Sequence, residues 1–470
     1  MTYRTSGEAF GETVASRLQA SEGELVLVTR EGKRALAVLA PREGPLESVT
    51  APVPATRPSV LGIGAALGDE ARCPEGTWLT EPATRPGIRA EGVFTFPIGP
   101  VRGDIMESVA FQLRVVGDEI LHLDLGLSYK ERGLESLLRN REVFQAAEIA
   151  ERVTGTTTVA HAYAFALAVE AALKISVKEE ASRLRGLLAE TERVAVHLGD
   201  LALLAASTGL PVAQMELMAL KERVLRANEG FSRHRYLRGM VRPGGISRPV
   251  TQEDVRPWCE AVLSTRPEAE RVLSDLSHTP SFADRLVRAG TISEQTIRYV
   301  KPVGPTGRSA GLDHDVRRDH PYGPYAVRSP SRVPVRTGAD AWARFEVRRD
   351  ELLVSYDWLA RTLSEPAPEE VAASFLHQRG PGRPDTESAL RRARFAGVGR
   401  VEGPRGPIAY WVLCRWGGNL DASEVTQCSI ASPSRRNWWT VPTAVANGNT
   451  MQDVPIIDAS FALSVSGSDL

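Results

Sequence analysis

The feature that most constrains the fold is the stretch 130–230, in which apolar side chains recur at helical spacing and helix-breaking residues are few. Apolar positions three and four residues apart lie on one face of a helix, and such faces are buried against one another. The segments 135–153, 159–175 and 179–209 all follow this pattern. We therefore expect an antiparallel helical bundle across this stretch.

Alternating patterns N-terminal to the bundle predict small β-sheets. Residues 24–40 contain two apolar runs around a Gly-containing turn, which predicts a β-hairpin. Residues 92–127 alternate between apolar and polar across a Val-Val-Gly-Asp-Glu turn, which predicts a small antiparallel sheet. The expected fold class is α+β and mainly helical, with a short N-terminal α+β domain plus a Pro/Gly-rich linker in 1–88 and a larger domain in 89–470.

Composition excludes several classes of function. Lys and Arg number 57 against 58 Asp and Glu, so the formal net charge of −1 gives no reason to expect a nucleic-acid partner. No apolar run approaches the roughly 20 residues that span a bilayer. Four cysteines occur singly and never as Cys-x-x-Cys, so we expect core cysteines and no Zn or Fe–S site bound by this chain: Cys73, Cys259, Cys414 and Cys428.

One short segment, 152–161 (RVTGTTTVAH), has the spacing of a ligand cage. Thr154, Thr157 and His161 are three and four residues apart and would share one helical face, so their side chains converge. Two of the three are hydroxyls, which are poor ligands for a soft metal. Two simpler interpretations stay open: the threonines cap the first helical turn, and His161 is a hydrogen-bonded core residue.

This segment resembles the first metal-binding motif of [NiFe] hydrogenase large subunits, R-x-C-G-x-C-x-x-x-H, with both cysteines replaced. It is also similar to the cysteine-free equivalent in the large hydrophilic subunit of complex I. Further blocks resemble both families and occur in the same order: 98–108, 127–138, 190–205, 303–325 and 401–412. The resemblance covers most of 95–470 and is greatest to formate hydrogenlyase-type, energy-converting large subunits. It implies a hydrogenase large-subunit-like helical bundle, with 1–85 as a shortened form of a domain related to a small complex I subunit.

The C-terminal segment, 462–470 (ALSVSGSDL), stands where the hydrogenases carry D-P-C-x-x-C. Ser464 and Gly467 occupy the two cysteine positions, so the resemblance implies a cage of Thr154, Thr157, Ser464 and Gly467. Nickel–iron chemistry needs soft thiolates, whereas hydroxyls stay protonated and glycine offers no ligand. We expect no nickel–iron centre, no metal bound by this chain and no hydrogenase activity.

In complex I the equivalent cavity reduces quinone, and a loop histidine and a segment tyrosine hold the headgroup. The tyrosine position is kept as Tyr129, whereas Arg102 and Glu131 replace histidines. An Arg can donate hydrogen bonds but cannot release a proton, so Glu131 would be the proton donor if burial raised its pKa. Together with His161, these residues form a candidate acceptor pocket. Alternatively, Arg102 and Glu131 form an ion pair that seals the cavity.

Other residues receive roles from the same resemblance or from their local pattern. The counterpart of Arg405 in hydrogenases faces the diatomic ligands of iron, so its charge is expected to point into the vacated cavity. His197 and Asp200 are predicted to form a structural hydrogen-bonded pair. Arg308, Asp315, Arg317 and Arg318 are expected to form an ion-pair network that ties helices together or meets a partner subunit.

Two functional hypotheses follow. In the first, the chain is an electron-transfer subunit of a membrane-associated, complex I-like or hydrogenase-related complex. It would pass electrons from a [4Fe–4S] cluster in a partner small subunit to a quinone or other small acceptor. In the second, it is a catalytically silent structural or coupling subunit of that complex. Either way we expect integral membrane antiporter-like partners and a peripheral location on the cytoplasmic face of the membrane.

Overall fold

The computed structural model describes residues 92–101, 107–365 and 394–470 in full. Of the remaining residues it describes the backbone of five short strands: 2–4, 24–31, 34–40, 47–52 and 370–371. Arg102 and Cys73 lie outside the described residues. So does most of the segment that would mark a domain boundary near residue 88, and that boundary stays a prediction.

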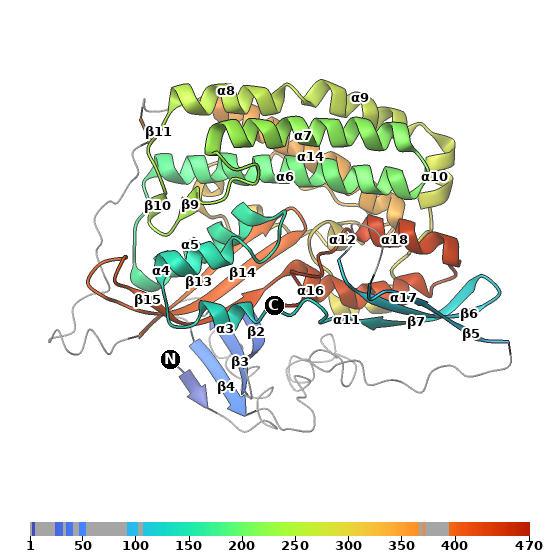
Figure 1. The fold of residues 1–470 in the computed structure, drawn as a ribbon, viewed down its shortest axis with the longest axis horizontal. Coiled ribbons are helices and arrows are strands. Elements are labelled where there is room, and N and C mark those ends of the chain that lie inside the picture. The colour runs from blue at the N-terminus through green and yellow to red at the C-terminus, as the bar shows by residue number, and fades with distance from the viewer. Residues whose placement is uncertain are drawn as a thin grey trace.

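Helices make up most of the described chain and stack in layers (Figure 1). In chain order they are α3 (Leu134–Leu138), α4 (Val143–Ala150), α5 (Thr158–Leu173), α6 (Glu179–Ser207), α7 (Pro211–Ser232), α8 (Gln252–Leu263), α9 (Arg266–Ser277), α10 (Pro280–Leu286), α11 (Glu294–Val300), α12 (Gly304–Arg308), α13 (Val316–Asp319), η2 (Gly323–Ala326), α14 (Ala341–Leu363), α16 (Pro433–Asn437), η3 (Trp438–Thr440), α17 (Val441–Val445), η4 (Met451–Asp453) and α18 (Val454–Phe461).

The strands form separate small sheets. An N-terminal sheet has the order β1-β4-β3-β2, with β1 (Thr2–Arg4), β2 (Glu24–Glu31), β3 (Arg34–Ala40) and β4 (Glu47–Pro52). A second has the order β5-β6-β7, with β5 (Phe94–Ile98), β6 (Ala110–Val116) and β7 (Glu119–Gly126). A third has the order β13-β14-β15-β8, with β13 (Arg394–Gly403), β14 (Gly406–Arg415), β15 (Glu424–Ala431) and β8 (Arg141–Glu142). Two-stranded pairs join β9 (Val241–Arg242) to β10 (Gly245–Ile246) and β11 (Val250–Thr251) to β12 (Glu370–Val371).

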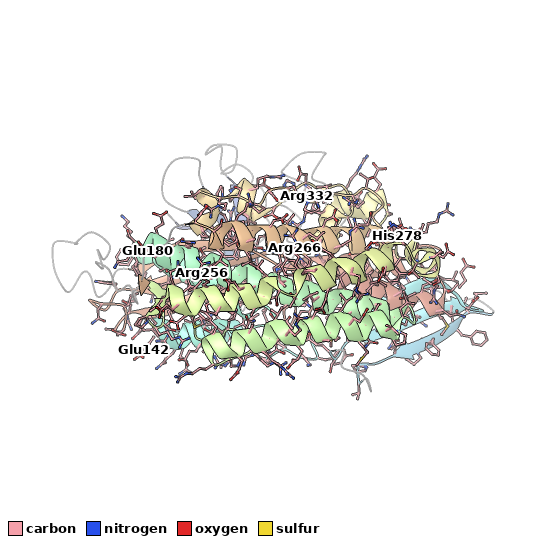
Figure 2. The ribbon with its side chains drawn as sticks, turned by 90° about the horizontal axis from the view of Figure 1, so that it is seen from above. Glu142, Glu180, Arg256, Arg266, His278 and Arg332 are labelled. Carbon is pink, nitrogen blue, oxygen red and sulfur yellow. The ribbon has the colours of Figure 1, made fainter. Side chains whose placement is uncertain are left out.

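Helix α6 is the centre of the bundle. Its residues from Leu184 to Ala205 are almost continuously buried, because α7 and α14 pack along it and α5 crosses near it. A helix buried on every side needs apolar or internally paired side chains all round. Outside it, α8 and α9 form a layer whose outer face is polar, as Arg256 and His278 show in Figure 2.

Helix α5 lies directly against strand β13. Gly397 and Gly399 on the strand leave no room for a side chain: a Cβ would lie 2.1 Å from the Ala168 carbonyl oxygen and 2.0 Å from that of Ala164, respectively. On the helix side the contact surface is alanine, at positions four residues apart. Small residues on both elements therefore let the two backbones touch.

The expected fold class, α+β and mainly helical with small antiparallel sheets, is confirmed. The hairpin expected at 24–40 is β2–β3, and the sheet expected at 92–127 is β5-β6-β7. Cys259, Cys414 and Cys428 are buried, as a core role requires. Among the described helices, none combines the length and apolar character that crossing a membrane requires.

The α5–β13 contact predicts a large effect from one methyl group. Gly399→Ala should lower the free energy of unfolding by about 3 kcal/mol or prevent folding, because the new Cβ meets helix backbone that cannot move aside. Gly230→Ala is the matched control, since a Cβ there meets nothing within 4 Å and α7 should gain up to about 1 kcal/mol. Urea unfolding of both variants checks this, and equal stabilities would contradict it.

Candidate functional site

The structure brings the two motif segments, 152–161 and 462–470, together. The hydroxyls of Thr154 and Thr157 hydrogen-bond to each other just before α5 begins. In the other segment, the Gly467 N–H donates to Ser464 Oγ at 3.1 Å. A Cβ at position 467 would lie 3.0 Å from the Thr154 methyl carbon, so the four predicted cage positions form one contiguous cluster.

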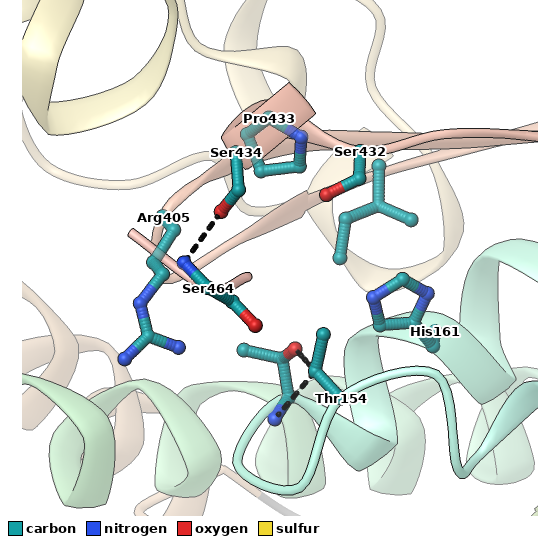
Figure 3. Close-up of a pocket in the computed structure, with 9 residues that line it drawn as sticks. Thr154, His161, Arg405, Ser432, Pro433, Ser434 and Ser464 are labelled. Atoms are coloured by element: carbon teal, nitrogen blue, oxygen red, sulfur yellow. Dashed lines mark hydrogen bonds between the residues drawn. The ribbon is translucent and has the colours of Figure 1, made fainter. Parts of the chain in front are cut away.

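A small cavity lies inside this cluster (Figure 3). The space that the centre of a water molecule can occupy inside it is about 10 Å³. This leaves room for about one water molecule. Ser434 narrows it by accepting the Ser464 N–H at 3.0 Å. The lining residues are Thr154, Thr157, His161, Arg405, Ile408, Ser432, Pro433, Ser434 and Ser464.

His161 lines the cavity as a neutral, bound side chain. It is 1% exposed, and its Nδ1 lies 3.0 Å from the Tyr410 hydroxyl. Burial lowers the pKa of His161 to about 3, and the nearby Arg132 charge adds to the effect. A histidine in this state does not exchange protons near neutral pH, which favours the core interpretation over a reactive one.

Arg405 reaches the cavity, but its charge is already matched. Its guanidinium donates to Asp200 Oδ1 at 2.9 Å, to Thr156 Oγ1 at 2.9 Å and to the Ala462 carbonyl. The positive charge is therefore held between α6 and the two motif segments. Arg405 thus lines the cavity, as expected, and its charge there is paired with Asp200.

Residues that sequence reasoning missed hold the two motif segments in place by binding their backbone. The buried Glu192 carboxylate accepts the N–H groups of Val159 at 2.6 Å and Ala160 at 3.0 Å, and so caps α5. Glu192 thus caps the first turn of α5, a role considered above for Thr154 and Thr157. Burial raises the pKa of Glu192 to about 8, although the two N–H donors oppose the shift.

Glu107 and Arg132 clamp the C-terminal segment. Glu107 Oε2 accepts the Ser466 N–H at 3.0 Å, the Ser464 hydroxyl at 3.2 Å and the Val465 N–H. Arg132 donates to the carbonyls of Val153 at 2.6 Å and Ser466 at 3.2 Å, and so ties the two motif segments together. Burial alone would raise the pKa of Glu107, but the hydrogen bonds from Ser466, Val465 and Ser464 outweigh it and lower the pKa.

The other candidate pocket residues lie elsewhere. Tyr129 is 53% exposed and Glu131 is exposed, and neither lines the cavity. Glu131 therefore lacks the burial that its proposed role as proton donor requires. Arg102 lies outside the described residues, so its pairing with Glu131 stays a prediction.

The sequence predicted one hydrogen-bonded pair and one ion-pair network. The pair is wrong, and three of the four residues of the network are right. His197 does not pair with Asp200: its Nε2 lies 3.0 Å from Glu351, and Asp200 binds Arg405 instead. Arg308, Asp315 and Arg317 do form a buried ion-pair network. Arg318 lies at the surface with Asp313 and Asp319.

A family model described as the 49 kDa subunit of respiratory-chain NADH dehydrogenase matches residues 208–469, more than half of the chain. The chain belongs to this family. A second family model, for nickel-dependent hydrogenases, matches residues 132–204 of the chain. This range includes the first motif segment, 152–161. The two matches meet at the α6–α7 turn, so the family resemblance seen in the motifs is confirmed across both halves of the site.

Known proteins similar to the chain carry the names of complex subunits. Formate hydrogenlyase subunit 5 of Escherichia coli K12 is 28% identical over 78% of this chain, which spans 61% of that protein. The membrane-bound hydrogenase subunit alpha of Pyrococcus furiosus is 25% identical over 79% of this chain and 86% of that protein. A chain in the structure of the membrane-bound sulfane sulfur reductase, an archaeal respiratory membrane complex, superposes with a TM-score of 0.68. It is 21% identical and covers 81% of this chain and 99% of that one, which shows a shared fold.

The hydrogenase match implies a nickel–iron centre on four thiolates, and the residues of this 49 kDa-subunit relative do not fit one. The hydroxyls of Thr154 and Thr157 hydrogen-bond to each other, and Ser464 Oγ hydrogen-bonds to Glu107 and Ser466. Gly467 has no ligand atom, and its Cα faces the Thr154 methyl. Hard, protonated donors around space for one water cannot hold a two-metal centre.

The Glu107 clamp predicts a pH-dependent contribution to stability. Because its folded-state pKa is lowered, the contribution is present above the unfolded value near 4.5 and is lost as pH falls through the folded value. Glu107→Gln should therefore cost about 1 kcal/mol at pH 7 and progressively less on acidification. Glu294→Gln, at a side chain 78% exposed, should change stability by less than about 0.5 kcal/mol at any pH. Thermal unfolding between pH 3 and 7 checks this, and a cost that does not depend on pH would contradict it.

Proposed function

We propose that this chain is a peripheral structural or coupling subunit of a membrane-bound, hydrogenase-related or complex I-like assembly. The relatives named above are subunits of such complexes, which supports a subunit role. The observation that carries the catalytically silent part of the proposal is the small size and polar pairing of the cavity. Its hydroxyls bind one another, its histidine is neutral, its arginine is paired, and it has room for about one water.

The proposed partners follow from the family. A small subunit with a [4Fe–4S] cluster would dock where the two motif segments meet, near the exposed 128–132 loop. Integral membrane, antiporter-like subunits would anchor the assembly, with this chain on the cytoplasmic face of the membrane. In this role the chain transmits structural changes between its partners and does no chemistry of its own.

Metal analysis of the purified assembly tests the absence of a nickel–iron centre. We expect iron from the partner's cluster and less than about one-tenth nickel per complex, because hydroxyl and glycine positions replace all four thiolates. The assembly should also evolve no hydrogen from a reduced viologen. Stoichiometric nickel would overturn the proposal, whatever the hydrogen assay gave.

A second candidate is an electron-transfer subunit that passes electrons from the partner's cluster to a quinone or other small acceptor. The observation that favours it is the exposed Tyr129 phenol, next to a loop held by Asp469, whose carboxylate accepts the Lys130 N–H at 3.1 Å. The acceptor would then bind at the surface, between this chain and its partner, and not in the small cavity lined by Thr154, His161 and Ser464.

Tyr129→Phe separates the two candidates. If the chain is silent, reoxidation of the partner's reduced cluster by a short-chain quinone should change by less than twofold, because no step uses the phenol. If Tyr129 hydrogen-bonds the acceptor, the rate should fall tenfold or more. The cluster's absorbance in the purified assembly gives the rate. Tyr236→Phe, at a partly buried tyrosine away from the motif segments, is the control for general effects of losing a hydroxyl.

A further inference from the structure

The connection between α7 and β9, residues 233–240 (RHRYLRGM), carries several basic side chains and no acidic one. An exposed arginine of the first motif segment lies beside it. We call the surface that they share the basic face, and its members are Arg152, Arg233, His234, Arg235 and Arg238. Three of its four arginines are exposed, and Arg238 is half-buried.

The arginines of the basic face come from two separate segments and lie close together around the His234 imidazole. Burial lowers the pKa of His234, and the charges of Arg238, Arg152 and Arg235 lower it further. Arg152 and Arg238 also lie within charge–charge range of Glu151, the residue that follows α4. These guanidinium groups therefore form one surface patch.

Hydrogen bonds tie the basic face to the first motif segment. The Glu151 carboxylate accepts the Gly239 N–H at 2.8 and 2.9 Å, and so joins the end of α4 to the α7–β9 connection. Arg132 donates to the Arg152 carbonyl at 2.9 Å, and so joins the 128–132 loop to the same segment. The basic face is therefore continuous with the side on which the two motif segments meet.

The backbone that carries the basic face is held in place by its own bonds. His234 Nδ1 accepts the Tyr236 N–H at 3.1 Å. The Asn228 side chain donates to the Arg235 carbonyl at 3.3 Å, and Leu237 anchors the connection in the core with 2% of its surface exposed. A surface that is already ordered loses little conformational freedom when it binds a ligand.

Two of the arginines have no partner within the part of the chain that the structure describes. The guanidinium groups of Arg233 and Arg238 form no hydrogen bond or ion pair with any described residue. The Nε of Arg238 is shielded from solvent as well as unpaired. Leaving a shielded donor unpaired costs free energy, which a ligand outside the chain would recover.

The carboxylates near the basic face leave many of its donors unused. Glu222 is shared between Arg235 and Arg226. Arg152 donates to Glu148, but to its backbone carbonyl. Among the described residues, neither the Glu148 nor the Glu229 carboxylate forms an ion pair with an arginine of the basic face. Guanidinium donors therefore remain available at the surface.

Unused guanidinium donors on an ordered surface fit the carboxylates of a protein. A guanidinium pairs with a carboxylate through two parallel hydrogen bonds and is weakly hydrated, and arginine is enriched in protein interfaces for these reasons. A lipid surface fits less well, because no large apolar side chain in 231–248 is exposed for insertion. The formal net charge of −1 disfavours a nucleic acid.

We propose that the basic face docks an acidic surface of the partner subunit, with its guanidinium groups opposite the partner's carboxylates. This inference rests on the proposed function, because it requires a partner on the side where the two motif segments meet. It adds what that partner carries, namely Asp or Glu side chains opposite the α7–β9 connection. Salt should weaken the contact, because charges at a surface are screened over about 10 Å at 0.1 M ionic strength.

Zero-length cross-linking in the purified assembly tests the contact directly. Arg238→Lys keeps the charge and supplies an amine, which a carbodiimide joins to a carboxylate in contact with it. We expect mass spectrometry to find a cross-link from position 238 to an Asp or Glu of the partner. Arg256→Lys, on the outer face of α8, is the matched control and should give no cross-link to that subunit (Figure 2). A position 238 without a cross-link to the partner would overturn the proposal.

Charge reversal in the purified assembly measures how much the basic face contributes. Arg233→Glu combined with Arg238→Glu should lower the amount of partner retained on the tagged chain about fivefold at roughly 0.15 M NaCl. Arg256→Glu combined with Arg298→Glu changes the net charge equally at exposed arginines elsewhere, and should change retention by less than about twofold. The melting temperature of the full chain should shift by less than about 2 °C in either double variant, since surface substitutions cost little stability.

The outcomes separate this inference from the proposed function. If the wild-type chain retains no partner even at low salt, both fail together. If the wild type and the Arg233→Glu, Arg238→Glu variant retain the partner equally, the basic face is overturned and the proposed function stands. Sedimentation of the full chain with phosphatidylglycerol vesicles tests lipid as the anion. Binding to these vesicles that the same variant abolishes would assign the face to lipid and overturn the proposal.

Discussion

The contact on which the rest of the structure depends is the one between the backbones of α5 and β13. Because glycines at 397 and 399 admit the helix so closely, α5 is held against the strand that ends at Gly403. The cavity and the Arg405 turn lie next to these two elements: His161, which lines the cavity, is on α5, and the turn with Arg405 follows β13. The close packing of α5 on β13 therefore helps to position both.

Much of the fold could be predicted from the sequence, because long periodic segments specify helices whatever surrounds them. The pattern in 159–175 corresponds to α5, Thr158–Leu173, and that in 179–209 to α6, Glu179–Ser207. The α5–β13 contact could not be predicted. Glycine in a strand normally reads as a weakness, and only the three-dimensional neighbour shows why Gly397 and Gly399 are required.

The sequence predicted the four cage positions of the candidate site, but not the residues that hold the backbone of the two motif segments. The family resemblance correctly grouped Thr154, Thr157, Ser464 and Gly467, but it gave no sign of Glu107, Arg132 or Glu192. Those three bind backbone N–H and C=O groups, which every residue carries, so no residue pattern marks their partners. The family pattern also assigned Tyr129 and Glu131 to an acceptor pocket; both lie at the surface and outside the small cavity, so that assignment stays a prediction.

The contact between Thr154 and Gly467 also couples changes at these two positions in evolution. The Thr154 methyl fills the space that a side chain at 467 would need, with Ser432 Oγ 3.2 Å away on the other side. A cysteine at 467 would therefore need the Thr154 methyl to move by a few tenths of an ångström, or a smaller residue at 154. Substitutions at the two positions are thus expected to depend on each other.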